Sequence, residues 1–184
     1  ASAPELPATK MEAYCYNGMF ANCTKLTSAP DLHAKRLESN CYNCMFEGCT
    51  SLTSAPELPA TYLVRECYHS MFNGCTSLTS APKLPATTLE WGCYSEMFQG
   101  CTSLTSAPEL PAKELIRNCY QLMFKDCSKL RYVKALFTTS PSEETTKDWL
   151  SGVAASGTFV KSKNATWNVI GVHGIPKGWK IETR

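Results

Sequence analysis

Eleven cysteines and three histidines are the residues of this chain that could carry nucleophilic or metal chemistry. Cys41 and Cys44 are separated by two residues, with Cys49 and His69 nearby, and zinc sites use such spacing. No second pair with that spacing occurs, and the other two histidines stand in unrelated contexts. A thiol nucleophile needs one distinguished cysteine beside a base. We therefore predict no zinc site, no cofactor and no enzymatic activity.

Ten of the cysteines recur at a fixed step of 26 residues, in two columns. The first column is Cys15, Cys41, Cys67, Cys93 and Cys119, and the second is Cys23, Cys49, Cys75, Cys101 and Cys127. Side chains stacked on neighbouring repeats keep their Cβ atoms about 4.8 Å apart, beyond the roughly 3.8 Å of a disulfide. We predict free, buried thiols that pack as small apolar residues, with at most Cys44, which belongs to neither column, open to labelling.

The same 26-residue step governs the elements that must position these side chains. It repeats the pairs Met19-Phe20 to Met123-Phe124 and the leucines from Leu26 to Leu130, and such self-similarity is typical of a solenoid. Within one repeat, the apolar residues between Cys93 and Cys101 fall on a single helical arc. The helix is expected to end before the second cysteine, at Asn22, Gly48, Gly74, Gly100 and Asp126, because these residue types tolerate a left-handed backbone.

A short strand is expected to follow each helix, as in Leu104 to Ala107, and the prolines Pro108 and Pro111 then interrupt regular pairing. The sequence Met97-Phe98-Gln99-Gly100-Cys101-Thr102-Ser103-Leu104 resembles the leucine-rich repeats of BspA-like surface proteins of host-associated bacteria. The resemblance covers residues 1–130. It implies an α/β solenoid, leucine-rich-repeat-like and right-handed, and an adhesive, protein-binding role as a secreted or cell-surface-anchored protein.

Residues 131–184 do not continue the 26-residue repeat, and we interpret them as a C-terminal α+β cap. Strands are expected at 131–137, 157–161 and 179–181, and Ser142 is a plausible N-cap for a helix through Trp149 and Val153. Large aromatics including Trp167 and Trp179 suit the covering of an exposed core layer. Two domains are thus expected, 1–130 and 131–184.

Composition limits the partners. A net charge of +2 without basic runs gives no footprint for nucleic acid, and no apolar run approaches the length of a membrane span, so we expect no direct membrane insertion. A monomer is expected. The opening Ala1-Ser2-Ala3-Pro4-Glu5-Leu6-Pro7 matches the tail of a repeat, from which we expect the natural protein to extend upstream.

Two rows of equivalent residues and one aromatic are the candidate binding features. The hydroxyl row is Thr27, Thr53, Thr79 and Thr105; the acidic column is Glu5, Asp31, Glu57, Lys83 and Glu109, with one lysine. The column is either an exposed polar edge that keeps the sheet soluble or a stripe for a cation or polar ligand. Trp91, in the variable block before the first cysteine, is either a partner anchor or a residue packed on the next repeat.

We therefore predict a non-enzymatic binding or adhesion module that presents a rigid repeated surface to a host or bacterial surface protein or to a glycan. The alternative is a structural spacer that displays another domain of a longer surface protein.

Overall fold

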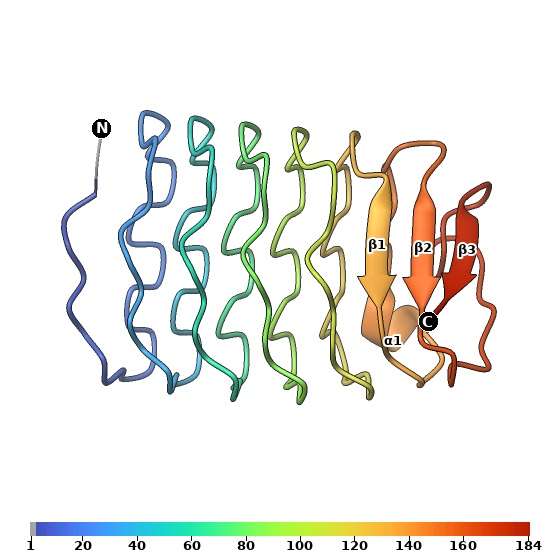
Figure 1. Ribbon diagram of the computed structural model, residues 1–184. Coiled ribbons are helices and arrows are strands. Elements are labelled where there is room, and N and C mark those ends of the chain that lie inside the picture. Colours follow the sequence, from blue (N-terminus) through green and yellow to red (C-terminus); the bar gives the residue numbers. More distant parts are fainter. Residues whose placement is uncertain (1–2) are drawn as a thin grey trace.

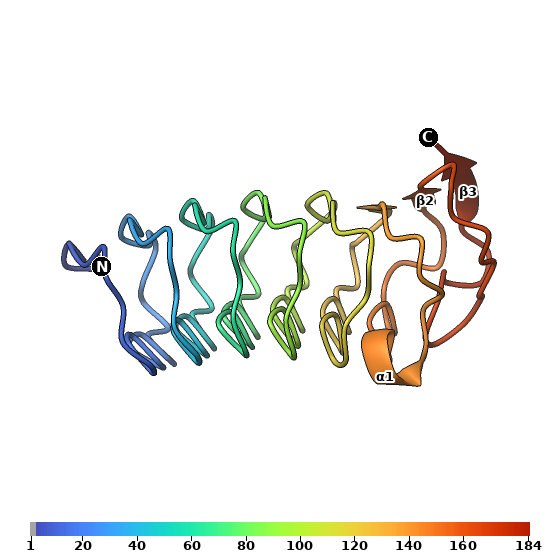
Figure 2. The ribbon, with the colours of Figure 1, turned by 90° about the horizontal axis from the view of Figure 1, so that it is seen from below.

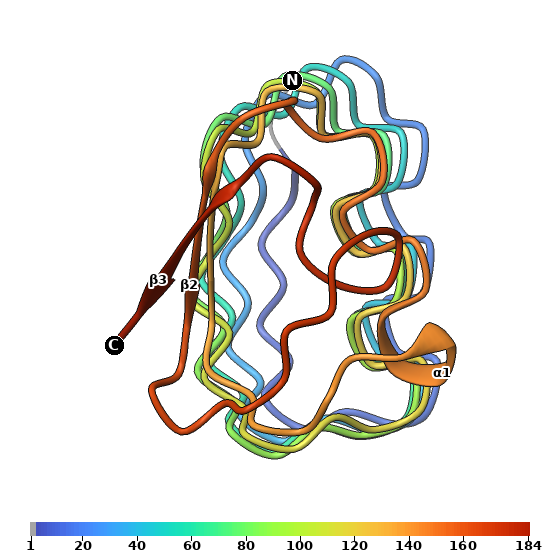
Figure 3. The same cartoon turned by 90° about the vertical axis from the view of Figure 1, so that its right-hand side faces the viewer.

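The structure, a computed structural model, describes residues 3–184 and arranges successive 26-residue segments side by side in sequence order (Figure 1). We call each of these segments a coil. Viewed along the stack, the coils follow nearly the same outline (Figure 3). The expectation of a repeat tail at the N-terminus concerns Ala1 and Ser2 in part, and these two lie outside the described residues.

The prediction of a leucine-rich-repeat-like solenoid, with a strand and a helix in each repeat, is wrong. Within the described part of the chain, the one α-helix is α1 (Glu143–Thr146), and it lies outside the repeats. The named strands are β1 (Tyr132–Ala135), β2 (Thr158–Lys161) and β3 (Lys180–Thr183). They form one open parallel sheet in the order β1-β2-β3, with Val133 beside Phe159 and Phe159 beside Ile181.

The segment between the two cysteines of each repeat is a chain of tight turns instead of a helix. Every fourth residue has a left-handed backbone: in the third coil these are Glu66, Ser70 and Gly74, with φ of 52°, 51° and 72°. An α-helix of L-residues cannot contain such a residue at every turn. The five residues predicted to end the helices all have positive φ, between 59° and 72°, although no helix precedes them.

The backbone hydrogen bonds of this segment alternate between two kinds of partner. The N–H of Met45 donates to the carbonyl of Tyr42 three residues earlier, at 3.2 Å, and closes a turn. The next N–H, that of Phe46, donates to Met71 in the following coil at 2.9 Å. Half of the donors therefore hold the turn and half hold the stack together, which satisfies the backbone in a buried segment.

Columns of identical side chains fill the core. The phenylalanines of internal coils are fully buried and stack at centroid distances of 5.5–5.6 Å: Phe46, Phe72, Phe98 and Phe124. The tyrosines Tyr42, Tyr68 and Tyr94 stack in the same way at 5.9 Å. Apolar burial and dispersion between like rings are the main source of stability in such a stack.

On the opposite side of each coil the chain is extended but pairs only at single positions. Ser54 bridges Ser80, and Tyr62 bridges both Arg36 and Thr88. Proline lacks an N–H, so the repeated Ala-Pro-x-Leu-Pro sequence cannot sustain a ladder. The ladder becomes continuous only at β1, which contains no proline.

The C-terminal segment covers the last coil. The N–H of Phe124 donates to the carbonyl of Trp149 at 2.9 Å, so residues after α1 take the place of a further coil. Trp149 is fully buried, and its Nε1 donates to the carbonyl of Gly174 at 2.8 Å. Figure 2 shows α1 beside the final coil, and the segment between β2 and β3 crosses the end of the stack in Figure 3. The helix begins after Ser142 as predicted, but it ends at Thr146, well before Val153.

Candidate binding face

The hydroxyl row and the acidic column lie on the extended side of the coils, which we call the strand face. Their side chains are exposed, and the leucines that directly follow the acidic column are buried: Leu32, Leu58, Leu84 and Leu110. Alternation of this kind is what an extended segment with one face on a core produces. The sequence therefore located the exposed side correctly, although the segments carrying it are not regular strands.

The threonine row takes part in coil-to-coil contact. The Thr79 Oγ1 donates to the carbonyl of Thr53 at 3.2 Å, and the Thr79 backbone N–H reaches the same oxygen at 3.2 Å. The carbonyl of Thr105 accepts from the N–H of Arg131 at 3.0 Å. The row therefore contributes to cohesion of the stack as well as to its surface.

The acidic column is not uniform along the stack. Asp31 and Glu57 are exposed and, among residues 3–184, neither forms an ion pair. Glu109 instead receives the Lys134 ammonium at 2.7 Å, and Lys83 occupies the place before it. Only the first coils of the strand face therefore present unneutralised carboxylates.

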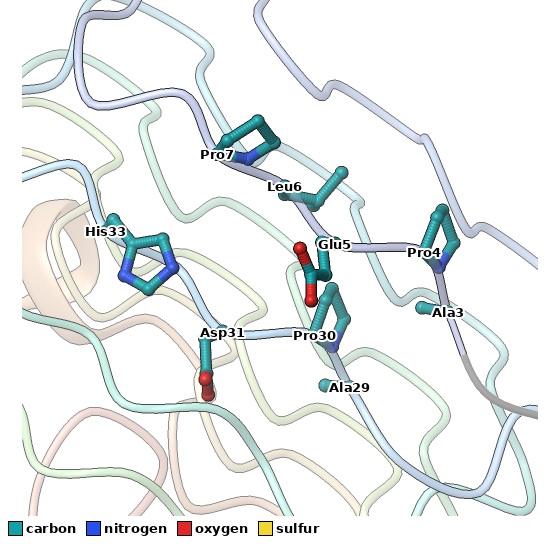
Figure 4. Close-up of a pocket in the computed structure, with 9 residues that line it drawn as sticks. All are labelled: Ala3, Pro4, Glu5, Leu6, Pro7, Ala29, Pro30, Asp31 and His33. Atoms are coloured by element: carbon teal, nitrogen blue, oxygen red, sulfur yellow. The ribbon is translucent and has the colours of Figure 1, made fainter.

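Furrows separate neighbouring coils on this face where the prolines prevent pairing. The first, about 510 Å³ in volume, lies between Pro4, Pro7 and Pro30 and contains Glu5, Asp31 and His33 (Figure 4). The second, about 330 Å³, repeats the arrangement between Pro82, Pro85, Pro108 and Pro111 and contains Lys83 and Glu109. Sequence reasoning treated these prolines only as breaks in pairing, although their regular Pro-x-x-Pro spacing was a visible signal of a recurring shape.

The groups in the first furrow do not converge on one point. In Figure 4 the Glu5 carboxylate extends toward Pro30, whereas the Asp31 carboxylate extends away from it. The part of the chain that the structure describes contains no group of three His, Cys, Asp or Glu residues placed to hold a metal ion. Rigid walls with separated carboxylates suit hydrogen bonding to a partner's hydroxyl or amide groups.

All eleven cysteines are free thiols, and the eight column cysteines of the internal coils are buried, as predicted. The second column has a directional role that the sequence did not reveal. The Cys101 thiol donates to the carbonyl of Phe72 in the preceding coil at 3.2 Å, and Cys49, Cys75 and Cys127 repeat this contact. Burial raises the pKa of the Cys49 thiol to about 11 and that of Cys75 to about 12, so these thiols stay protonated and unreactive.

The prediction that at most Cys44 is open to labelling is wrong. Cys23 is exposed and Cys15 half-buried because the first coil has a neighbour on one side only in the described chain. Cys44 is half-buried, its thiol donates to the Asn43 Oδ1 at 2.9 Å, and burial raises its pKa to about 12. Cys41 turns its thiol to the carbonyl of Glu12 at 3.1 Å, so the two thiols of the Cys-x-x-Cys sequence have different partners.

The aromatics of the variable block behave differently from one another. Trp91 is half-buried, and the Arg65 guanidinium lies 4.3 Å from its ring centroid, in the geometry of a cation–π contact. Its ring therefore packs on the preceding coil, and it is not a free anchor. Tyr14 in the first coil is 64% exposed.

Within residues 3–184, no helix has the length and apolar character needed to cross a membrane. Comparison with models of known protein families, with curated proteins and with solved structures found no match for this chain.

Proposed function

We propose that the protein is a non-enzymatic binding module whose strand face meets a surface protein or a glycan outside the cell. The supporting observation is the proline-walled furrow, because it recurs along a rigid and exposed face. A partner with its own repeated groups gains from such recurrence, since each additional contact is made without new ordering of the protein. The extracellular or cell-surface location rests on the resemblance to BspA-like surface proteins alone.

The geometry favours the first coils as the contact region. Asp31 and Glu57 are exposed and unneutralised there, whereas Glu109 is already bound by Lys134. A partner that donates hydrogen bonds replaces water at Asp31 and Glu57 without breaking an existing ion pair. Charge-assisted hydrogen bonds are about twice as strong as neutral ones.

The test is a screen of the folded protein against arrays of glycans and of host extracellular proteins, followed by affinity measurement on each hit. A double variant Asp31→Asn and Glu57→Gln keeps the shape of the face and removes its charge. The expected result is about tenfold weaker binding, as for the loss of charge-assisted hydrogen bonds. Glu90→Gln is the matched control, because Glu90 is exposed on another part of the repeat.

Absence of binding by the wild-type protein on both arrays would favour the spacer role over the binding role. Binding that the double variant keeps at full strength would place the partner elsewhere on the molecule. A thermal melt of each variant shows whether a loss of binding reflects unfolding.

A further inference from the structure

A second surface lies beyond the end of the strand face, where each coil turns back toward its next run of turns. Two adjoining cavities of about 630 and 580 Å³ share Lys35, Arg36 and Glu38 and together extend across the first three coils. We call this continuous hollow the basic groove. It is separate from the furrows of the strand face, except that His33 borders both.

Three cations line the basic groove without a salt bridge. Lys10, Lys35 and Arg36 are exposed, and none belongs to an ion pair within the described residues. Elsewhere on the surface, lysines such as Lys134 and Lys147 do have a carboxylate partner. The cations of the groove are therefore available to an anionic ligand.

An open aromatic ring stands at the far end of the same groove. Tyr62 is 65% exposed, the largest exposed fraction among the large apolar and aromatic side chains of residues 3–184. The backbone of Tyr62 forms a parallel bridge with Arg36, the equivalent residue of the preceding coil. The Tyr62 ring and the Arg36 guanidinium are therefore carried by paired residues of neighbouring coils. A flat, uncovered ring offers a stacking surface for the apolar face of a ligand.

The residues of the groove also differ from one repeat to the next. At the position of Lys35 the later coils carry Thr61, Thr87 and Lys113; at the position of Arg36 they carry Tyr62, Thr88 and Glu114. The core columns, in contrast, keep the same residue in coil after coil. A grouping of cations and an aromatic in adjacent coils is not required by stacking, because these side chains face solvent.

The carboxylates of Glu12 and Glu38 line the groove beside the cations. They would repel a dense polyanion, but they accept hydrogen bonds from hydroxyl groups. A ligand that carries hydroxyls and widely spaced anionic groups on flat apolar rings fits this combination. We propose that the basic groove binds an acidic oligosaccharide, with a sugar ring on Tyr62 and its carboxylate or sulfate on Lys35 and Arg36.

The experiment measures binding of the folded protein by calorimetry at 150 mM salt, with four probes of similar length. An oligogalacturonate supplies carboxylates, and a κ-carrageenan-derived oligosaccharide supplies one sulfate per disaccharide and no carboxylate, so that the two sources of negative charge are separated. A maltohexaose supplies rings without charge, and a hexaglutamate peptide supplies charge without rings. The expected result is binding of at least one acidic oligosaccharide and no measurable binding of the other two probes.

The variants test the residues. The double variant Lys35→Gln and Arg36→Gln is expected to weaken binding at least about tenfold, and Tyr62→Ser about fivefold. Lys113→Gln is the matched control, since Lys113 occupies the position of Lys35 in a later coil; its affinity stays within about twofold. If the double variant has a lowered Tm, the single variant Arg36→Gln is used in its place to measure the loss of affinity.

Binding of neither acidic oligosaccharide overturns the proposal, as does equal binding of hexaglutamate, which would indicate a peptide site. An equal loss in Lys113→Gln overturns it as well, because the effect would then be one of total charge. The variant Asp31→Asn with Glu57→Gln is expected to keep this binding. The proposal for the basic groove and the proposal for the strand face are therefore tested independently.

Discussion

The stacked phenylalanines of the core allow a comparison of how much stability a ring contributes when it packs between two coils and when it packs against only one. Phe98 is fully buried and stacks on Phe72 at 5.6 Å and on Phe124 at 5.5 Å. Phe20, at the same position of the first coil, is 8% exposed and stacks only on Phe46, at 5.6 Å. Phe98→Ala and Phe20→Ala therefore remove the same atoms from sites with two neighbours and with one.

The expected costs differ by about a factor of two. Phe98→Ala leaves an enclosed cavity, so the loss combines transfer and cavity terms and comes to about 3 to 5 kcal/mol. Phe20→Ala leaves a space open to solvent, so mainly the transfer term is lost, about 1.5 to 3 kcal/mol. For a chain of 184 residues, losses of about 4 and 2 kcal/mol correspond to Tm shifts of roughly 10 and 5 °C.

Denaturant and thermal unfolding, followed by circular dichroism, measure both variants against the wild type. Two effects of equal size would refute the reasoning, because the cost would then not depend on enclosure between two coils. A Phe98→Ala protein with an unchanged Tm would show that this column does not carry the core.

Three further outcomes follow from single contacts. Gly74→Asn is expected to be tolerated within about 1 kcal/mol, because a Cβ there would lie 3.7 Å from the Gly48 backbone of the preceding coil, whereas Gly152→Asn costs more, because a Cβ there would meet the Asp126 side chain and, at 3.1 Å, its Cα; thermal melts compare the two. Maleimide labelling of the native protein at pH 7.5 is expected to modify Cys23 first and to leave the eight buried thiols unlabelled until denaturant is added, as read by intact mass; rapid labelling at four or more sites would contradict the burial. Trp149→Phe is expected to cost about 1 to 3 kcal/mol, because it leaves a buried carbonyl without its 2.8 Å donor; an unchanged unfolding midpoint would mean that water replaces the indole.

The sequence allowed the core to be predicted but not the backbone that carries it. The burial of Cys93, Tyr94, Met97, Phe98 and Cys101 follows from their repetition, and all five are buried. Their spacing is i, i+1, i+4, i+5 and i+8, which is a repeat of four residues. A helix with 3.6 residues per turn places such a set on one face, and so does a chain of turns that repeats every four residues.

One position with a left-handed backbone did carry a sequence signal that distinguishes a chain of turns from a helix. Gly18 lies four residues before the expected helix end, in the interior of the expected helix, where glycine is disfavoured. Side-chain contacts between neighbouring coils had no comparable signal. The pairing of Glu109 with Lys134 and of Arg65 with Trp91 depends on how far neighbouring coils are offset, which no single repeat reveals.

The sign of one substitution distinguishes the chain of turns from a helix. Glu96 has a φ of 58°, so its side chain strains a left-handed backbone, and its carboxylate accepts only a 3.4 Å contact from Ser70. In a helix interior Glu96→Gly would lower stability by about 0.5 to 1 kcal/mol. In the left-handed position it instead relieves about 1 to 2 kcal/mol of strain, which exceeds that loss, so the Tm is expected to rise by a few degrees. Asn73→Gly is the control, because Asn73 lies outside the set of residues with positive φ, and its Tm is expected to fall. A fall of equal size in both variants would mean that the segment between the cysteines is helical in solution.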